Sequence, residues 1–260
     1  MTRVLLSPHP DDAVWSCGGM LGRWADEPGG LTVVNVFDGP GMEARRAEDA
    51  RALARWPLSV RGLGFTEAAR RHGDDGRPLY PTPLARRRPR HRGEDRLVAE
   101  VAAALAPYLR DASEVLVPLA RRTHVDHEIV REAAAYALDG AFQAVPPVPA
   151  GASGVRVTWH EEFPYAPPRR VPAGLAAEEH PADLDEWLAA ALEYRSEVTA
   201  MFGDAERFAR ALRRHARSGA ATGTGGTAVW RAWTPAPRTR TARARAGERA
   251  GAGERAWYGT

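Results

Sequence analysis

The sequence predicts an α/β protein with a Rossmann-like, mostly parallel sheet that is covered by helices on both faces. Short apolar segments rich in β-branched residues recur along the chain, and stretches with helical spacing separate them. The 260 residues are enough to form one hydrophobic core. Strands and helices that alternate in this way form β-α-β units, whose strands pair in parallel through right-handed crossovers.

The first β-α-β unit lies at the N-terminus. Residues 4–7 are an apolar run that Pro8 interrupts, so a buried strand is expected there. A second, valine-rich strand is expected at 31–37, directly after a Pro-Gly-Gly turn signal. The stretch between them predicts a helix at 13–25, which completes the unit.

Two more elements and a long polar segment come next. A helix is expected at 43–56, where Pro57 stops the helical pattern, and a strand at 59–65. Residues 66–92 are polar, rich in Arg and without periodicity, and they contain four prolines. A segment of this length and composition is either a functional lid or a disordered excursion.

The alternation then resumes and ends in a different kind of sequence. The expected elements are a helix at 94–109, a strand at 114–119, a helix at 126–138, a connector at 144–154, a strand at 155–163, and one long or two shorter helices at 184–215. We therefore expect a domain at 1–217 and a C-terminal segment at 218–260. This segment is expected to be a partly flexible tail rich in Arg, Ala and Gly, parts of which Trp230, Trp233, Trp257 and Tyr258 could anchor.

The composition argues against several classes of protein. The single cysteine, Cys17, forms no intramolecular disulfide, and neither an export signal nor a membrane-spanning run is expected. All 36 basic residues are Arg, but 33 acidic residues nearly balance them, so nucleic-acid binding is not indicated. We expect a cytoplasmic protein that acts on a small molecule, with no membrane or nucleic-acid partner. The oligomeric state is not predicted.

Two loops carry His and Asp side chains directly after predicted strands. Residues 7–12 have the sequence SPHPDD, and residues 124–127 have the sequence HVDH. Ligands bind beyond the carboxyl ends of the strands in an open parallel sheet. Imidazole and carboxylate groups suit zinc, and two His with one carboxylate also suit Fe(II). Each loop alone is equally explained by an Asp that caps the next helix, but together they predict a metal site.

These motifs resemble those of the PIG-L/LmbE-like family of zinc-dependent N-deacetylases. The resemblance rests on 7–12, the Cys-Gly-Gly at 17–19 and 124–127, in that order, with further matches at 45–48, 161–165 and 194–197. It implies the Rossmann-like fold of that family. It also implies hydrolysis of an N-acyl group, usually N-acetyl, on an amino sugar or sugar conjugate, in natural-product or sugar-conjugate biosynthesis.

The resemblance also implies a role for each polar residue of the two loops. The implied roles are metal ligand for His9, Asp12 and His127, general base for Asp11, polarisation or protonation for His124, and orientation of an imidazole for Asp126. The implied metal is zinc, with Fe(II) as the alternative. Three protein ligands leave one coordination position open, which is typical of a catalytic site.

Four side chains are candidates for binding the substrate, namely Arg45, Trp15, Arg122 and Tyr165. Arg45 is nearly as well explained by an ion pair with Glu48 on the same helix. Arg122 and its neighbour Arg121 suit a phosphate or carboxylate group, or else face solvent. Trp15 fits either the face of a sugar ring or the core. His160, Glu162 and Tyr165 line a sugar pocket in one interpretation and form an ordinary strand end in the other.

Two other classes of function are compatible with the sequence. A sugar-binding protein of the same fold would bind its ligand without releasing acetate, but Asp11 and His124 argue against it because binding alone requires neither group. A nucleic-acid contact through the Arg-rich 86–92 and the tail would weaken steeply as salt rises. The near-balance of charge argues against this second alternative.

Overall fold

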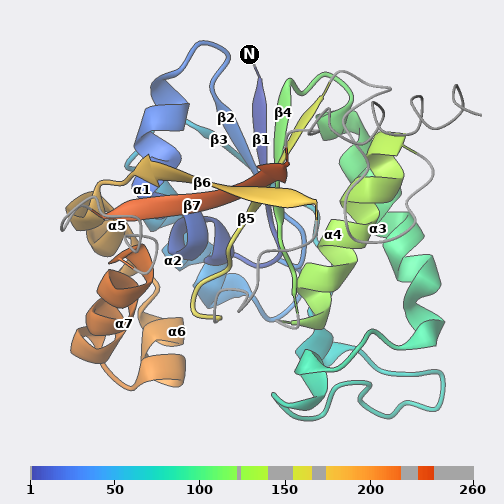
Figure 1. Ribbon diagram of the computed structural model, residues 1–260. Coiled ribbons are helices and arrows are strands. Elements are labelled where there is room, and N and C mark those ends of the chain that lie inside the picture. The colour runs from blue at the N-terminus through green and yellow to red at the C-terminus, as the bar shows by residue number, and fades with distance from the viewer. Residues whose placement is uncertain (1, 122–123, 140–154, 166–173, 218–227, 237–260) are drawn as a thin grey trace, which may run out of the picture.

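The computed structural model of the chain describes residues 2–121, 124–139, 155–165, 174–217 and 228–236. Its strands are β1 (Arg3–Ser7), β2 (Leu31–Asn35), β3 (Ser59–Gly62), β4 (Glu114–Pro118), β5 (Arg156–His160), β6 (Leu175–Pro181) and β7 (Val229–Pro235). They form one seven-stranded sheet with the order β3-β2-β1-β4-β5-β7-β6 (Figure 1).

The sheet is parallel on one side and antiparallel at one edge. The strands β3, β2, β1, β4 and β5 pair in parallel, as the alternation of strands and helices predicts. The strand β7 pairs antiparallel with both β5 and β6. The predicted fold class is therefore confirmed, with a two-stranded antiparallel extension that the sequence pattern does not indicate.

Helices cover both faces of the sheet. They are α1 (Asp12–Asp26), α2 (Glu43–Leu53), α3 (Asp95–Leu109), α4 (Val125–Asp139), α5 (Leu184–Ala191), α6 (Arg195–Phe202) and α7 (Ala205–Arg217). Figure 1 shows α1 and α5 to α7 on one side and α3 and α4 on the other. Because successive strand residues point to opposite faces, Leu5 and Leu6 of β1 belong to two separate hydrophobic cores, one on each side.

The C-terminal part of the chain differs most from the expectation. The helical stretch at 184–215 divides into three helices, α5, α6 and α7. The predicted domain end at 217 is too early, because β7 inserts between β5 and β6 and buries both Trp230 and Trp233. The expected connector at 144–154 and the rest of the expected tail lie outside the described residues. In the described part of the chain, no helix has the length and apolar character that a membrane span requires.

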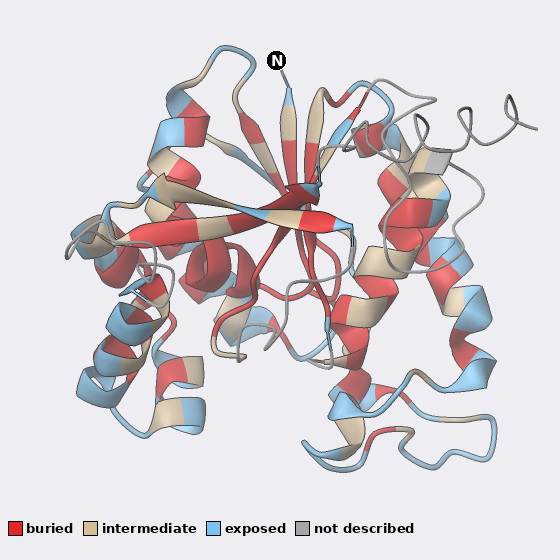
Figure 2. Ribbon diagram, viewed as in Figure 1, coloured by how far each residue is buried: buried red, intermediate tan, exposed pale blue. Residues whose placement is uncertain are grey.

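The segment 66–92 has a buried root and an exposed tip. It contains the short 3-10 helices η1 (Ala68–Arg70) and η2 (Ala85–Arg87), and η3 (Arg92–Glu94) begins at its last residue. Arg71 and Tyr80 are buried, whereas most residues around η2 are exposed (Figure 2). The segment is thus an ordered excursion that is fixed to the domain at Arg71 and Tyr80.

Candidate active site

The two His/Asp loops meet because β1 and β4 are neighbours in the sheet. Leu5 pairs with Leu116 in parallel register, so the loops that follow both strands leave the same edge. His9, Asp12 and His127 each offer one ligand atom, and these atoms lie within 4.8 Å of one another. All three side chains are buried. The structure therefore brings together the three residues that the family resemblance implies as metal ligands.

Each imidazole of this cluster is held at both ring nitrogens. Asp12 Oδ2 lies 3.0 Å from His9 Nδ1 and 3.3 Å from His127 Nε2. On the other side, His9 Nε2 is 2.9 Å from Asp126 Oδ2, and His127 Nδ1 is 3.1 Å from Glu162 Oε1. A histidine that binds a metal through one nitrogen usually donates from the other to a carboxylate, which fixes its tautomer and orientation. The donor set and its supporting carboxylates therefore fit a divalent cation.

A second group of ligand atoms shares His9 with the first. His9, His124 and Asp126 also place one ligand atom each within 4.8 Å of the others. However, Asp126 already accepts from the guanidinium of Arg71 at 2.5 Å and from the backbone N–H of Ala68 at 2.9 Å. Because Arg71 and Ala68 already engage the Asp126 carboxylate, Asp126 acts as the hydrogen-bond acceptor for His9 and not as a metal ligand. It orients His9 rather than His124, whose Nδ1 lies 3.7 Å away.

The pKa values of this cluster are set more by the pairing of imidazoles with carboxylates than by burial. Burial lowers the pKa of His9, but Asp12 and Asp126 raise that pKa to about 9. Burial lowers the pKa of His127 as well, and Asp12 and Glu162 raise it to about 10. Burial would raise the pKa of Asp12, yet His127 and His9 hold it well below its usual range. A cation that binds here must displace protons from both imidazoles, so its binding strengthens as the pH rises.

His124 is a different kind of histidine. Burial lowers its pKa to about 3, with Asp126 opposing the effect and His9 and His127 adding to it. The backbone N–H of Asp126 donates to His124 Nδ1 at 3.2 Å, which places the proton of the neutral ring on Nε2. A neutral ring that lines the pocket can polarise a carbonyl group through this N–H. Of the two implied roles, polarisation therefore fits the geometry better than protonation.

Asp11 is strained and buried beside the cluster. Its φ of 135° lies in the left-handed region, which non-glycine residues rarely adopt and which costs about 1–3 kcal/mol. Burial raises the pKa of its carboxyl group well above the ordinary value, and Arg45, whose Nε is 4.0 Å from Asp11 Oδ2, partly opposes this rise. A buried carboxylate with a raised pKa is suited to accept and hold a proton.

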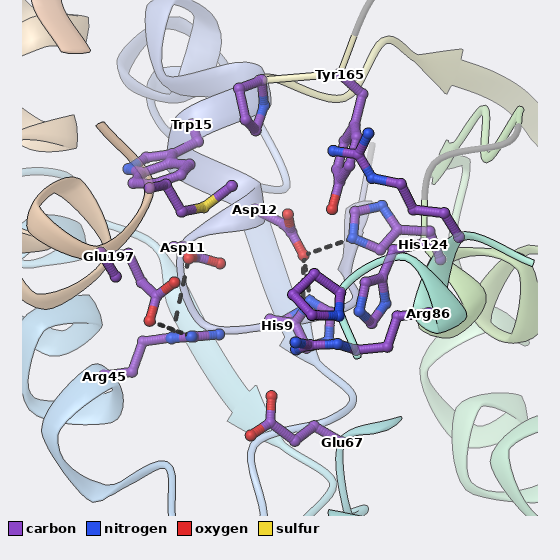
Figure 3. A pocket seen from close by; sticks show the side chains of 16 residues that line it. His9, Asp11, Asp12, Trp15, Arg45, Glu67, Arg86, His124, Tyr165 and Glu197 are labelled. Carbon is purple, nitrogen blue, oxygen red and sulfur yellow. Dashed lines mark hydrogen bonds and ion pairs between the residues drawn. The ribbon is translucent and has the colours of Figure 1, made fainter. Parts of the chain in front are cut away.

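These side chains surround one cavity of about 420 Å³ (Figure 3). The polar and charged residues that line it are His9, Asp11, Asp12, Arg45, Glu67, Arg86, Arg87, His124, His127, Tyr165 and Glu197. They come from the loops after β1 and β4 and the first turns of α1 and α4, from α2 and α6, from the region after β5, and from the segment 66–92. A cavity of this size is typical of a small-molecule site.

Three of the four predicted substrate residues, Arg45, Tyr165 and Trp15, line this cavity. Arg45 forms ion pairs with Glu197 and with Asp11, so the alternative explanation, a pair with Glu48, is wrong. The Glu48 carboxylate instead accepts from the hydroxyl of Ser196 at 2.5 Å. Tyr165 also lines the cavity, with its ring centroid 5.5 Å from that of His127.

The other predictions for the pocket need correction or lie outside the described residues. Trp15 borders the cavity but is 1% exposed, and its indole N–H donates to the backbone oxygen of Ala191 at 3.2 Å. Of the two interpretations of Trp15, the structure favours the core, because its ring packs against Phe163 and Phe208. Glu162 supports His127 instead of lining the pocket. Arg122 lies outside the described residues, and Arg121 is exposed.

Sequence reasoning missed several residues of the pocket. Glu67, Arg86 and Arg87 come from the segment 66–92, whose composition shows charge but no periodicity that would place a given side chain. Glu197 falls within a matched stretch of the sequence, yet nothing there indicates its ion pair with Arg45. These contacts are tertiary, and only the folded chain reveals them.

The chain is similar to known proteins in sequence and in fold. Residues 4–138 match the family of GlcNAc-PI de-N-acetylases, PIG-L. The chain is 30% identical to the 2'-N-acetylparomamine deacetylase of Streptomyces fradiae, over 90% of this chain and 90% of that protein. A deacetylase of the teicoplanin biosynthesis pathway, solved as a complex with bog, has a TM-score of 0.72 at 24% identity, covering 92% of this chain and 100% of that one. The zinc-inhibited form of teicoplanin deacetylase gives 0.72 at 23% identity, with the same coverage.

Proposed function

Since the chain belongs to the PIG-L family of de-N-acetylases, we propose that it is a metal-dependent hydrolase that removes an N-acyl group from an amino sugar or sugar conjugate. The products are the free amine and a carboxylate, which is acetate when the acyl group is acetyl. The observation that carries this proposal is the cluster of His9, Asp12 and His127 beside Asp11 in one cavity. Relatives that deacetylate N-acetylparomamine and act in teicoplanin biosynthesis favour natural-product biosynthesis as the setting.

The two nitrogens and one carboxylate oxygen of the cluster suit zinc, with Fe(II) as the alternative. His9, Asp12 and His127 would hold the ion. When bound, such an ion polarises a carbonyl group and lowers the pKa of water to about 7. The zinc-inhibited form of teicoplanin deacetylase, a protein of similar fold, supports the binding of a metal, and the identity of the working metal is part of the test.

The remaining residues of the pocket divide the proton transfers among them. Asp11 takes the proton of the attacking water and returns it to the leaving amine, since burial lets this carboxyl group hold a proton. His124 donates its Nε2–H to the acyl oxygen on which negative charge develops, an interaction that is stronger in the transition state than in the bound amide. Arg45, braced by Glu197, keeps the Asp11 carboxylate in place.

The test measures metal content and amine release together. The purified protein is assayed with N-acetylglucosamine and N-acetylparomamine, as isolated, after chelation, and after addition of zinc or Fe(II). We expect chelation to abolish amine release and one of the two metals to restore it. We expect Asp11→Asn to lower kcat by about 10²–10⁴-fold while metal content is retained, since general base catalysis contributes that much. His127→Ala is expected to lose both the metal and the activity.

Arg77→Gln is the control, because the Arg77 side chain is 87% exposed, forms an ion pair with Asp75, and does not line the cavity. Unchanged turnover in Asp11→Asn would contradict the proposed mechanism. Tight binding of N-acetylated sugars with no amine release, even with metal supplied, would identify the alternative, a catalytically inactive sugar-binding protein of the same fold.

A further inference from the structure

One wall of the cavity carries two guanidinium groups that the proposed reaction does not use. Arg86 and Arg87 belong to η2, at the exposed tip of the segment 66–92, and both line the cavity. Figure 3 shows Arg86 in the same pocket as His9, His124 and Arg45. The same exposed tip therefore supplies two positive charges to the space in which a substrate must lie.

These two arginines differ from the other charged groups of the cavity. Arg45 is paired with Glu197, Glu67 with Arg70, and Asp12 with two histidines. Within the described ranges, the guanidinium groups of Arg86 and Arg87 form no ion pair with a carboxylate. Of the segments outside the description, 122–123, 140–154, 166–173 and 218–227 contain no Asp or Glu, and 237–260 contains Glu248 and Glu254.

Part of the Arg86 guanidinium is also cut off from solvent. Its Nε is buried, and no hydrogen-bond acceptor for it lies among the described residues. A buried donor without an acceptor costs about 1–3 kcal/mol, and a ligand in the cavity can supply the missing acceptor. The guanidinium carbon of Arg87 lies 5.4 Å from the ring centroid of Tyr165, which limits the conformations that Arg87 can adopt.

We propose that Arg86 and Arg87 bind an acidic group on the substrate, so that the protein prefers N-acylated amino sugars bearing a carboxylate or phosphate over neutral ones. This inference rests on the proposed deacetylase function. Guanidinium groups bind carboxylates and phosphates through paired, charge-assisted hydrogen bonds, and a group held in place by an aromatic ring loses little freedom on binding. The sequence suggests the same role for Arg121 and Arg122, of which Arg121 is exposed and Arg122 lies outside the described residues.

The experiment compares neutral and acidic substrates in matched variants. The substrates are N-acetylglucosamine, its 1-phosphate, its 6-phosphate and N-acetylglucosaminuronic acid, which separate phosphate from carboxylate recognition. For the wild-type protein, we expect kcat/KM to be at least about tenfold higher for one acidic sugar than for the neutral one, mainly through a lower KM. The preference is expected to fall to within about twofold in Arg86→Gln/Arg87→Gln. Arg88→Gln, exposed and not part of the cavity lining, keeps the wild-type preference.

A binding measurement separates this inference from the proposed function. Calorimetry on Asp11→Asn, with and without Arg86→Gln/Arg87→Gln, follows the affinity for the same sugars without turnover. If no sugar releases amine but the acidic sugars bind more tightly and lose this advantage in the arginine variant, the proposed function fails and the inference stands. Equal affinity and equal kcat/KM for acidic and neutral sugars would overturn it. Arg87→Lys, which keeps the charge but loses the planar fork, is expected to lie between the wild type and Arg87→Gln.

Discussion

The cavity has two walls whose charges are satisfied in different ways. In the histidine wall, formed by His9, Asp12 and His127, every ionisable side chain is buried and has an oppositely charged or hydrogen-bonding partner. In the arginine wall, formed by Arg86 and Arg87, the side chains are more exposed and have no carboxylate partner in the described part of the chain. The first wall suits an ion held in fixed geometry, and the second suits a charge that arrives with a ligand.

The two walls are joined by one buried residue. The guanidinium of Arg71, at the root of the segment 66–92, donates to Asp126 and to Glu94, each at 2.5 Å. Asp126 in turn accepts from His9, and the hydroxyl of Tyr80 donates to Glu94 at 2.5 Å. The exposed arginine wall is thus tied to the histidine wall through a network in which each charge is compensated.

The largest expected effect comes from breaking this link. Arg71→Met should lower the free energy of unfolding by about 3–5 kcal/mol, because it leaves the carboxylates of Asp126 and Glu94 buried without their cation. Denaturant unfolding measures this change in free energy. The control is Arg77→Met in the same segment, where the side chain is 87% exposed, and it should change the free energy of unfolding by about 0.5 kcal/mol or less. A loss below about 1 kcal/mol in Arg71→Met would show that the two walls are not coupled in this way.

A smaller effect should appear in metal affinity when a support of the histidine wall is neutralised. Glu162→Gln keeps an oxygen that can accept from the Ala120 N–H, now 2.9 Å from Glu162 Oε1, but removes the charge beside His127 Nδ1. Loss of such a supporting carboxylate typically weakens metal binding by about 10–100-fold. Competition with a chromogenic chelator measures the affinity for zinc.

Glu161→Gln is the matched control for this measurement. The neighbouring Glu161 is also buried, but it accepts from Trp233 Nε1 and Arg231 rather than from a histidine. Its substitution should leave zinc affinity within about threefold of the wild type. Equal losses in both variants would mean that the effect is one of general stability, and that Glu162 has no specific role in holding His127.

The histidine wall could be predicted from the sequence because its residues lie in two short continuous motifs and because one rule of sheet topology brings these motifs together. The loops at 7–12 and 124–127 both follow apolar strands, and parallel neighbouring strands release their loops at one edge. The carboxylates that support the wall were predicted less well. Asp126 was expected to orient an imidazole, but whether that imidazole belonged to His9 or His124 depends on side-chain geometry.

The arginine wall and the antiparallel edge could not be predicted, for physical reasons. The tip of 66–92 reaches the cavity because Arg71 and Tyr80 anchor its root, and these contacts join residues far apart in the chain. The sequence of β6 has no apolar run, and the residues that follow β7 have a composition that favours disorder. Neither sequence therefore indicates a strand of the sheet. Trp15 follows the helical spacing equally well whether it faces the core or a ligand.

The smallest expected effect uses a buried carboxylate outside both walls. Asp49 accepts from Asn35 Nδ2 at 2.7 Å and from the Tyr194 hydroxyl at 2.6 Å, and no ion pair of Asp49 with a cation occurs in the described structure. Burial raises its pKa to about 6, although these two hydrogen bonds lower it, whereas the equally buried Asp12 has a lowered pKa beside its histidines. Asp49 therefore shows what burial does to a carboxylate that lacks the cationic partners of the histidine wall.

Because the folded protein binds the Asp49 proton more tightly than the unfolded chain, ionisation of Asp49 costs stability. The cost is absent below about pH 4, grows as the pH rises toward 6, and is complete above that value. Asp49→Asn removes it, and the Asn35 amide, whose Oδ1 has no partner, can turn to accept from the new amide. We expect Asp49→Asn to be about 1 kcal/mol more stable than the wild type at pH 7, since its weaker hydrogen bonds offset part of the gain from removing the buried charge.

Unfolding experiments at pH 7 and pH 4.5 should show this advantage only at the higher pH. The control, Asp26→Asn on the exposed end of α1, should show no advantage at either pH. An advantage of the wild type that is the same at both pH values would mean that the Asp49 carboxylate is stabilised as well as those beside the histidines, and the contrast between paired and unpaired buried charges would lose its basis.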